Sequence, residues 1–238
     1  MKKFAIYFGL AGLLISGLQA CSNSEAIQVN GVIDNPGNVK VVSFYEGDQK
    51  LDSTFIADGN KFKFERPATQ ERLLTIEVGK NRYPVILEPG KNVEFNVDLQ
   101  QPENYEIKGS DLSQKLKDFA PQKARIDFVR DSLQQSFSSA TAEMDANGIQ
   151  NLRSEMLMKF EPFFKNYINQ AVDFANKNED LAGFYVMSTL DPEMAEAELI
   201  SYADHIKDKF SNNRYVGEFK AEVDKLRKLA VGQKAPEI

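Results

Sequence analysis

Residues Leu51 to Glu65 read LDSTFIADGNKFKFE. From Lys61 to Glu65 polar and apolar side chains alternate, which is typical of a strand with one buried face. Asp58-Gly59 is a dipeptide that favours the tight turns of β-hairpins. The stretch therefore predicts two strands, over residues 51–57 and 61–65, joined as a hairpin.

The same pattern extends on both sides, with turn residues every eight to twelve positions. It predicts about eight short strands, over residues 27–33, 39–45, 51–57, 61–65, 72–78, 83–87, 93–99 and 105–108. Strands this closely spaced leave no room for crossover helices, so we expect an antiparallel β-sandwich or a strongly curled sheet over residues 27–109. One face is expected to bury, in part, Val29, Val41, Phe62, Phe64, Leu74, Ile76, Ile86 and Phe95.

Pro84 lies inside the predicted strand 83–87, where it removes a backbone donor. Prolines in sheets are confined to edge strands and strand ends, so this strand is expected at an edge or to begin there. An exposed edge offers a docking place for a strand of a partner protein.

After Gly109 the apolar spacing changes to 3.6 residues, and Ser110 and Asp111 are suited to cap a helix. The sequence predicts a helical region over residues 110–230, so the fold class is α+β, with the strands first and an all-α region second. Pro121 is expected to interrupt or kink the first helix. Residues 181–190 are expected to form the buried centre of a bundle, and Asp191 to cap the helix that follows.

The clearest helix carries a stripe of apolar side chains opposite its charges. This stripe could line a ligand pocket, but we expect it to be core: Leu152, Met156, Phe160, Phe163, Tyr167, Ala171 and Phe174.

The N-terminus resembles a secretory signal. Lys2 and Lys3 precede an uncharged run, Phe4 to Leu18, that spans only about 22 Å as a helix, too short for a permanent membrane span. The following Leu-Gln-Ala-Cys, ending at Cys21, resembles the bacterial lipobox. This resemblance implies a signal peptide over residues 1–20, lipid attachment at Cys21 and a polar tether over residues 21–26. The alternative is a free or buried cysteine behind a signal peptide without lipid.

Charge and composition exclude several classes of site. The formal net charge is −6, and it becomes −8 without the two lysines of residues 1–20. An acidic chain argues against a nucleic-acid partner. His205 is the single histidine, which we interpret as a surface or half-buried structural residue, so we expect no metal site. We expect no catalytic residues and no cofactor-binding residues.

Several segments together resemble a known family of bacterial lipoproteins. They are the sandwich opening at Ile27, residues 51–64, Leu87 to Gly90, Ile107 to Ser110, Leu181 to Met187 and Val231 to Ile238. They are similar to the N-terminal domain of unknown function, and the helical region after it, that precede a thioredoxin-like domain of the alkyl hydroperoxide reductase or thiol-disulfide interchange type. Residues 231–238 resemble the opening segment of that domain; the alternative is that Gly232 and Pro236 simply end the last helix.

The family's redox chemistry needs a Cys-x-x-Cys, whereas this chain has one cysteine, at position 21. We therefore expect a lipid-anchored, non-catalytic interaction or positioning module of the cell envelope. Ser22 after the cysteine favours the outer membrane, facing the periplasm, with the cell surface left open. Its partners would be the membrane, through the anchor, and an envelope protein. The alternative is the N-terminal fragment of a membrane-anchored thiol-disulfide oxidoreductase whose redox domain is lost or encoded separately.

Overall fold

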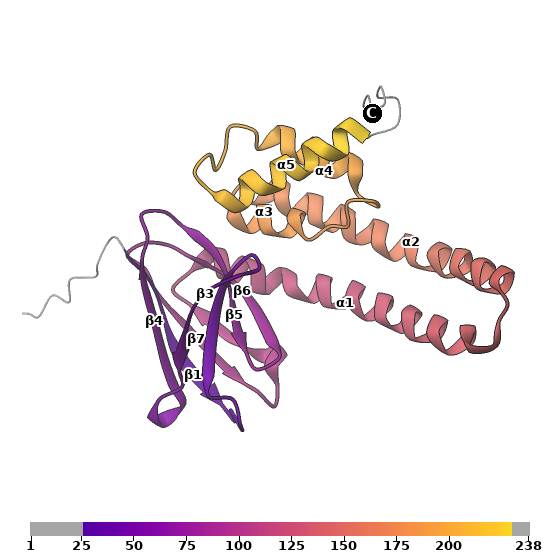
Figure 1. The fold of residues 1–238 in the computed structure, drawn as a ribbon. Coiled ribbons are helices and arrows are strands. Elements are labelled where there is room, and N and C mark those ends of the chain that lie inside the picture. Colours follow the sequence, from indigo (N-terminus) through magenta and orange to yellow (C-terminus); the bar gives the residue numbers. More distant parts are fainter. Residues whose placement is uncertain (1–25, 230–238) are drawn as a thin grey trace, which may run out of the picture.

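The computed structural model describes residues 26–229, and eight strands fill the first half of that range. They form two four-stranded sheets that face each other, in the orders β4-β1-β7-β8 and β3-β2-β5-β6 (Figure 1). Every pairing within the sheets is antiparallel except that of β1 with β7. The strands are β1 (Ala26–Asp34), β2 (Val41–Glu46), β3 (Gln49–Phe55), β4 (Lys61–Pro67), β5 (Arg72–Val78), β6 (Asn81–Leu87), β7 (Asn92–Asp98) and β8 (Glu106–Lys108). The prediction of a β-sandwich is confirmed.

The predicted hairpin at Asp58-Gly59 is wrong in its pairing. The tight turn does form, with Gly59 at φ 73° and the Ala57 amide donating to the Lys61 carbonyl at 2.7 Å. However, β3 pairs with β2, whereas β4 pairs with β1 in the other sheet. The turn therefore carries the chain from one sheet to the other at the side of the sandwich.

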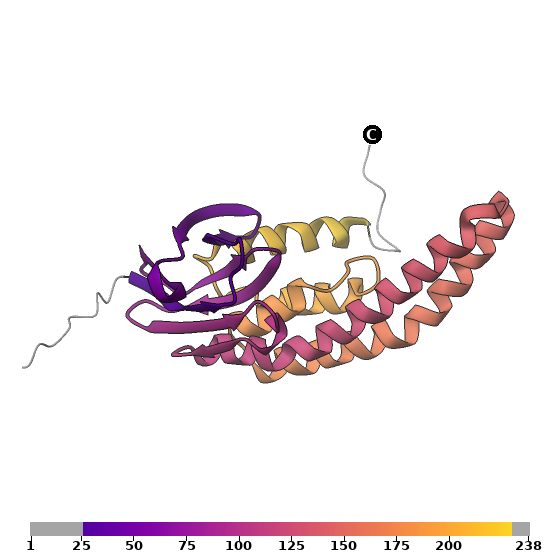
Figure 2. The same cartoon turned by 90° about the horizontal axis from the view of Figure 1, so that it is seen from below.

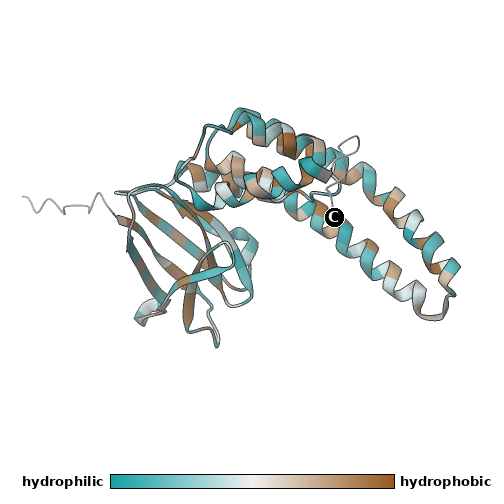
Figure 3. Ribbon diagram, turned by 45° about the horizontal axis from the view of Figure 1, so that its top comes forward, coloured by the Kyte–Doolittle hydropathy of each residue, from teal (hydrophilic) through white to brown (hydrophobic). Residues whose placement is uncertain are grey.

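The core between the sheets is rich in aromatic rings. Phe44 of one sheet stacks on Phe64 of the other with ring centroids 3.9 Å apart, and Phe95 is fully buried against Tyr83 and Tyr105. Alternating hydrophobic and hydrophilic bands follow the strands (Figure 3). Of the residues predicted to be buried, Val41 is only half-buried. Ile86 is buried, but it packs in the core of the helical region.

Strand β6 is an edge strand, as Pro84 predicted, and the start of α1 (Asp111–Ala140) covers that edge. The Ile86 amide donates to Ser113 Oγ at 2.8 Å, and the Ile86 carbonyl accepts from both Ser110 Oγ and Ser113 Oγ, at 2.8 and 2.9 Å. Pro84 is two residues from Ile86 and faces the same way, so its missing N–H costs no bond within the sheet. At Ile86 the edge is thus closed by hydroxyl groups of the chain itself.

Ser113→Ala is expected to lower the free energy of unfolding by about 1–3 kcal/mol, because it leaves the buried Ile86 amide without an acceptor. Ser136→Ala is the matched control on the same helix, since Ser136 is exposed and donates only to the Ser132 carbonyl. The control is expected to change stability by at most about 0.5 kcal/mol. Urea unfolding followed by circular dichroism measures the stability of both variants. Equal losses of stability would argue against Ser113 as the acceptor for the Ile86 amide.

Five helices follow the strands in the described range: α1 (Asp111–Ala140), α2 (Ala146–Lys177), α3 (Leu181–Ser188), α4 (Glu196–His205) and α5 (Arg214–Leu229). Helix α3 is almost wholly buried, which confirms the predicted centre of the bundle. Pro121 does not interrupt α1, which continues for nineteen further residues to Ala140. Asp191 does not cap α4, because its carboxylate accepts from the Glu193 amide in a turn and the helix begins at Glu196.

Helices α1 and α2 extend as an antiparallel pair well beyond the other three helices (Figures 1 and 2). Their inner halves pack on α3, where the stripe residues Tyr167 and Ala171 are buried as predicted and Phe174 is half-buried. The outer half of the stripe is not core: Leu152, Met156 and Phe160 are half-buried, and Phe163 is 47% exposed. The prediction of a buried stripe is therefore wrong for the outer half, where α1 and α2 extend past α3 (Figure 1).

Candidate functional site

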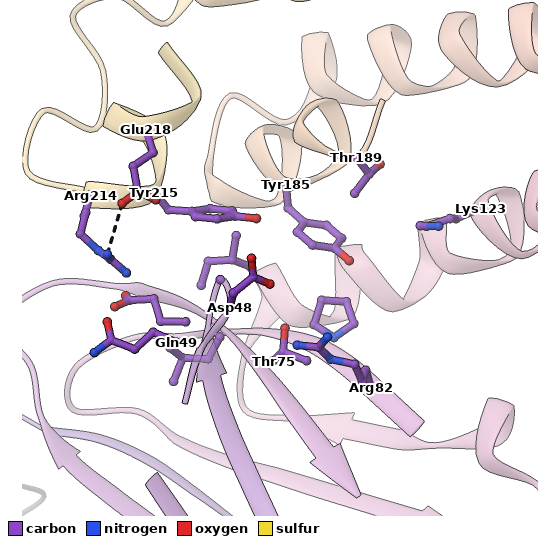
Figure 4. A pocket seen from close by; sticks show the side chains of 15 residues that line it. Asp48, Gln49, Thr75, Arg82, Lys123, Tyr185, Thr189, Arg214, Tyr215 and Glu218 are labelled. Carbon is purple, nitrogen blue, oxygen red and sulfur yellow. Dashed lines mark ion pairs between the residues drawn. The ribbon is translucent and has the colours of Figure 1, made fainter. Parts of the chain in front are cut away.

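A cleft of about 780 Å³ lies between the sandwich and the helices. One wall comes from the β2–β3 turn, β5 and β6, and the other from α1, α3 and α5 (Figure 4). This volume lies within the usual range for small-molecule sites, about 300–1,000 Å³. Because Leu73 of β5 and Ile86 of β6 pack into the helical core, the two walls share one hydrophobic cluster.

Two tyrosines, Tyr185 of α3 and Tyr215 of α5, line the helical wall of the cleft (Figure 4). The Tyr215 ring packs edge-to-face on Phe184, with centroids 5.8 Å apart. A Cβ at Gly47, whose φ is +59°, would lie 3.3 Å from Tyr215 Cε2, so the glycine lets the turn of the sandwich approach this ring closely. Burial raises the pKa of Tyr185 to about 12 and also raises the pKa of Tyr215. Both phenols are therefore protonated at neutral pH and able to donate hydrogen bonds.

The charged side chains that line the cleft are three basic and three acidic: Arg82, Lys123, Arg214, Glu46, Asp48 and Glu218. Each basic group has an acidic neighbour: Arg82 lies 3.6 Å from Glu77, Lys123 2.7 Å from Asp127 and Arg214 3.2 Å from Glu218.

Arg72 binds Glu46 with two hydrogen bonds, of 2.7 and 2.5 Å. Asp48, at the tip of the β2–β3 turn, makes no ion pair with any residue in the described range. The lining charges balance, so the cleft favours no strongly charged ligand. Tyrosine and arginine side chains of this kind are enriched where proteins bind partners.

The stability of the fold is expected to decrease as the pH rises above about 10, the pKa of tyrosine in an unfolded chain. Burial raises the folded-state pKa of Tyr185, and also those of Tyr83 and Tyr105, to about 12. The folded state therefore holds more protons than the unfolded state at pH 10–12. The stability that these groups contribute is complete below pH 10 and is lost as the pH rises through about 12.

Urea unfolding from pH 8 to 11 measures this loss. Tyr185→Phe should make the decline shallower, and an unchanged decline would contradict the assignment to this residue.

His205 lies on α4, away from the cleft. Its Nε2 atom is 3.3 Å from Glu179 Oε1, and its side chain is 48% exposed, which agrees with a surface or half-buried structural residue. A hydrogen bond from Lys209 lowers the pKa of Glu179, which supports this surface cluster. Within residues 26–229 no three histidine, cysteine or acidic side chains gather in a way that could hold a metal ion.

Cys21, the predicted site of lipid attachment, lies outside the described residues, as do the predicted signal peptide and residues 231–238. No helix in the described part of the chain has the length and apolar character needed to cross a membrane.

The cleft was not identified from the sequence, because its lining comes from distant segments. Asp48, Arg82, Tyr185 and Tyr215 belong to four different parts of the chain and form no motif. The pairing of Glu46 with Arg72 depends on the long-range contact of β2 with β5. The one local signal is Gly47, which falls between the predicted strands over residues 39–45 and 51–57.

Comparison with known proteins identifies one domain. Residues 27–116 match the family model described as Domain of unknown function (DUF4369). The match spans the sandwich and continues into α1 past Ser113, so it includes the serines that close the edge of β6. No curated protein and no solved structure matches this chain. The N-terminal domain of unknown function expected from the sequence is thus confirmed.

Proposed function

We propose that this protein is a lipid-anchored protein of the cell envelope and acts as a non-catalytic interaction and positioning module. The observation that carries the proposal is the lipobox-like sequence ending at Cys21, five residues before the first described strand. Three acyl chains would contribute about 30 kcal/mol to membrane binding at ~0.8 kcal/mol per buried methylene, which makes the anchor permanent.

The position of the first strand supports a role in positioning. Residues 21–25 can span at most roughly 17 Å, so the anchor would hold the sandwich close to the membrane. Strand β1 begins on the side of the sandwich that lies away from the projecting ends of α1 and α2 (Figures 1 and 2). Those projecting ends would therefore point away from the anchor.

The cleft supports binding more than catalysis. Its two walls are joined through the shared core at Leu73 and Ile86, which favours a preformed site. Its polar groups include two protonated tyrosines, and most of its charged side chains are already engaged in ion pairs. Such a lining suits a segment of an envelope protein that carries both charges and apolar side chains.

Cell fractionation of the native chain and of Cys21→Ala tests the anchor. The native protein is expected in the outer-membrane fraction, and the variant in the soluble fraction. The purified native protein is also expected to give no insulin reduction and no peroxidase turnover. If the native protein and Cys21→Ala appear in the same fraction, the lipid anchor is rejected. Measurable insulin reduction or peroxidase turnover would reject the non-catalytic role.

A second candidate function is that of the anchoring part of a thiol-disulfide oxidoreductase. It is favoured by the resemblance of Val231 to Ile238 to the opening segment of a thioredoxin-like domain. Translation of the DNA that follows the Ile238 codon, in all frames, tests it. A Trp-Cys-x-x-Cys-like motif within about one domain length would support this candidate. Absence of such a motif would leave the first proposal alone.

A further inference from the structure

The projecting parts of α1 and α2, residues 127–163, are here called the arm. Within the arm no described side chain is buried. Helices in proteins owe most of their stability to the packing of an apolar face, so a long pair of helices without a buried residue lacks part of that packing. Hydrophobic bands nevertheless continue along both helices of the arm (Figure 3). The arm therefore has an apolar face that nothing in the described chain covers.

The uncovered face forms a groove of about 460 Å³ between α1, α2 and the turn that precedes α4. Its apolar lining consists of Leu133, Phe137, Met156, Leu157, Phe160 and Met194. Leu157 is 56% exposed and Met194 is 37% exposed. Leu157 lies near the middle of this lining, between Met156 and Phe160 on α2. A helix of another chain laid along the groove would cover these side chains.

Four charged side chains line the groove, and one of them, Arg130 of α1, is paired with Asp127 and Asp131 at 3.1 and 3.2 Å. The other three are separated by sign. Arg153 lies on α2 on the side of Leu157 toward the end of the arm, whereas Asp191 and Glu193 lie in the turn that approaches from the body of the helices. None of the three makes an ion pair with another residue of the described range. Other charges of the arm are paired, among them Lys159 with Glu155 at 2.6 Å. The side chains of the groove that make no ion pair are thus basic toward one end and acidic toward the other.

We propose that the groove is the contact between two copies of this chain. A two-fold axis near Leu157 would lay the arms side by side in opposite directions. It would bring Arg153 of each copy toward Asp191 and Glu193 of the other. The two helices of each arm would then form an antiparallel four-helix bundle, in which the half-buried side chains of the groove become core. A surface with positive charge at one end and negative charge at the other is complementary to a second copy of itself. A groove for a uniformly charged partner would carry charges of one sign only.

Cysteine cross-linking tests this contact in the full chain, because its only natural cysteine is Cys21. Leu157→Cys places one thiol near the two-fold axis. Oxidation with copper phenanthroline is expected to give at least about five times more covalent dimer from it than from Met158→Cys, because a disulfide needs Cα atoms within about 7 Å. Met158 is the matched control: it is 66% exposed but lies outside the groove. Equal yields from the two variants would overturn the proposal.

A charge exchange tests the direction of the pairing. In the Leu157→Cys background, Arg153→Glu is expected to lower the dimer yield about two- to five-fold, and adding Glu193→Arg is expected to restore it. Failure of the second change to restore the yield would overturn the antiparallel arrangement. Sedimentation of the chain carrying Cys21→Ala is expected to show a dimer, converted to a monomer by Leu157→Asp with unchanged circular dichroism. A monomer at every concentration before that change would overturn the proposal altogether.

Discussion

Gly31→Ala is expected to destabilise the sandwich by about 3 kcal/mol or more. A Cβ at this position would lie 1.7 Å from the carbonyl oxygen of Phe95 and 2.6 Å from its carbonyl carbon. Both are backbone atoms of β7, the parallel neighbour of β1, so neither can rotate away as a flexible side chain does. The strands would have to separate, which would also strain the bond from the Val32 amide to Asn96 Oδ1.

Gly217→Ala is the matched control for this change. Gly217 lies in α5, and a Cβ there would meet no atom within 4 Å, so the substitution is expected to stabilise the protein by up to about 1 kcal/mol. Thermal unfolding followed by circular dichroism measures both variants. The same chemical change should thus have opposite signs at the two sites. A Gly31→Ala protein as stable as the native one would mean that β1 and β7 are not packed as described.

Phe184→Ala is expected to cost about 3–5 kcal/mol, the usual range for a fully buried phenylalanine. Phe184 has no exposed surface and packs edge-to-face against Tyr215 and Phe219, with ring centroids 5.8 and 5.4 Å away. It therefore joins α3 to α5 and supports the Tyr215 wall of the cleft. Removing its ring leaves a cavity in the centre of the helical core.

Phe128→Ala removes the same ring from a helix surface, because Phe128 is 75% exposed on α1. This control is expected to change stability by at most about 0.5 kcal/mol. Urea unfolding with a common denaturant slope allows the two losses to be compared directly. Similar losses from both variants would contradict the buried position of α3.

Local patterns predicted the elements well, because alternation and helical periodicity depend only on neighbouring residues. The eight strands and the buried helix at Leu181 followed from such patterns. The hairpin predicted at Asp58-Gly59 was wrong for the same reason. The dipeptide determines a turn, whereas the pairing of β4 with β1 depends on distant contacts, among them the stacking of Phe64 on Phe44.

Pro121 shows a second limit of local reasoning. Pro121 lacks a backbone N–H, so α1 loses one hydrogen bond there. Phe119 and Ile126, on either side of it, are buried in the helical core, and this packing keeps α1 continuous. The apolar stripe of α2 predicted a buried face over its whole length, yet burial ends where α1 and α2 extend past α3. The cleft was not predictable, since Tyr185, Tyr215 and Arg82 come together only through the packing of helices against a sheet.

Mass spectrometry of the intact protein, extracted from membranes with detergent, tests the lipid anchor most directly. We expect a chain that begins at Cys21 and is heavier than the polypeptide by a diacylglyceryl group and one further acyl chain. A chain that begins elsewhere, or a residue 21 that carries no lipid and can be reduced and reoxidised, would contradict the lipid anchor.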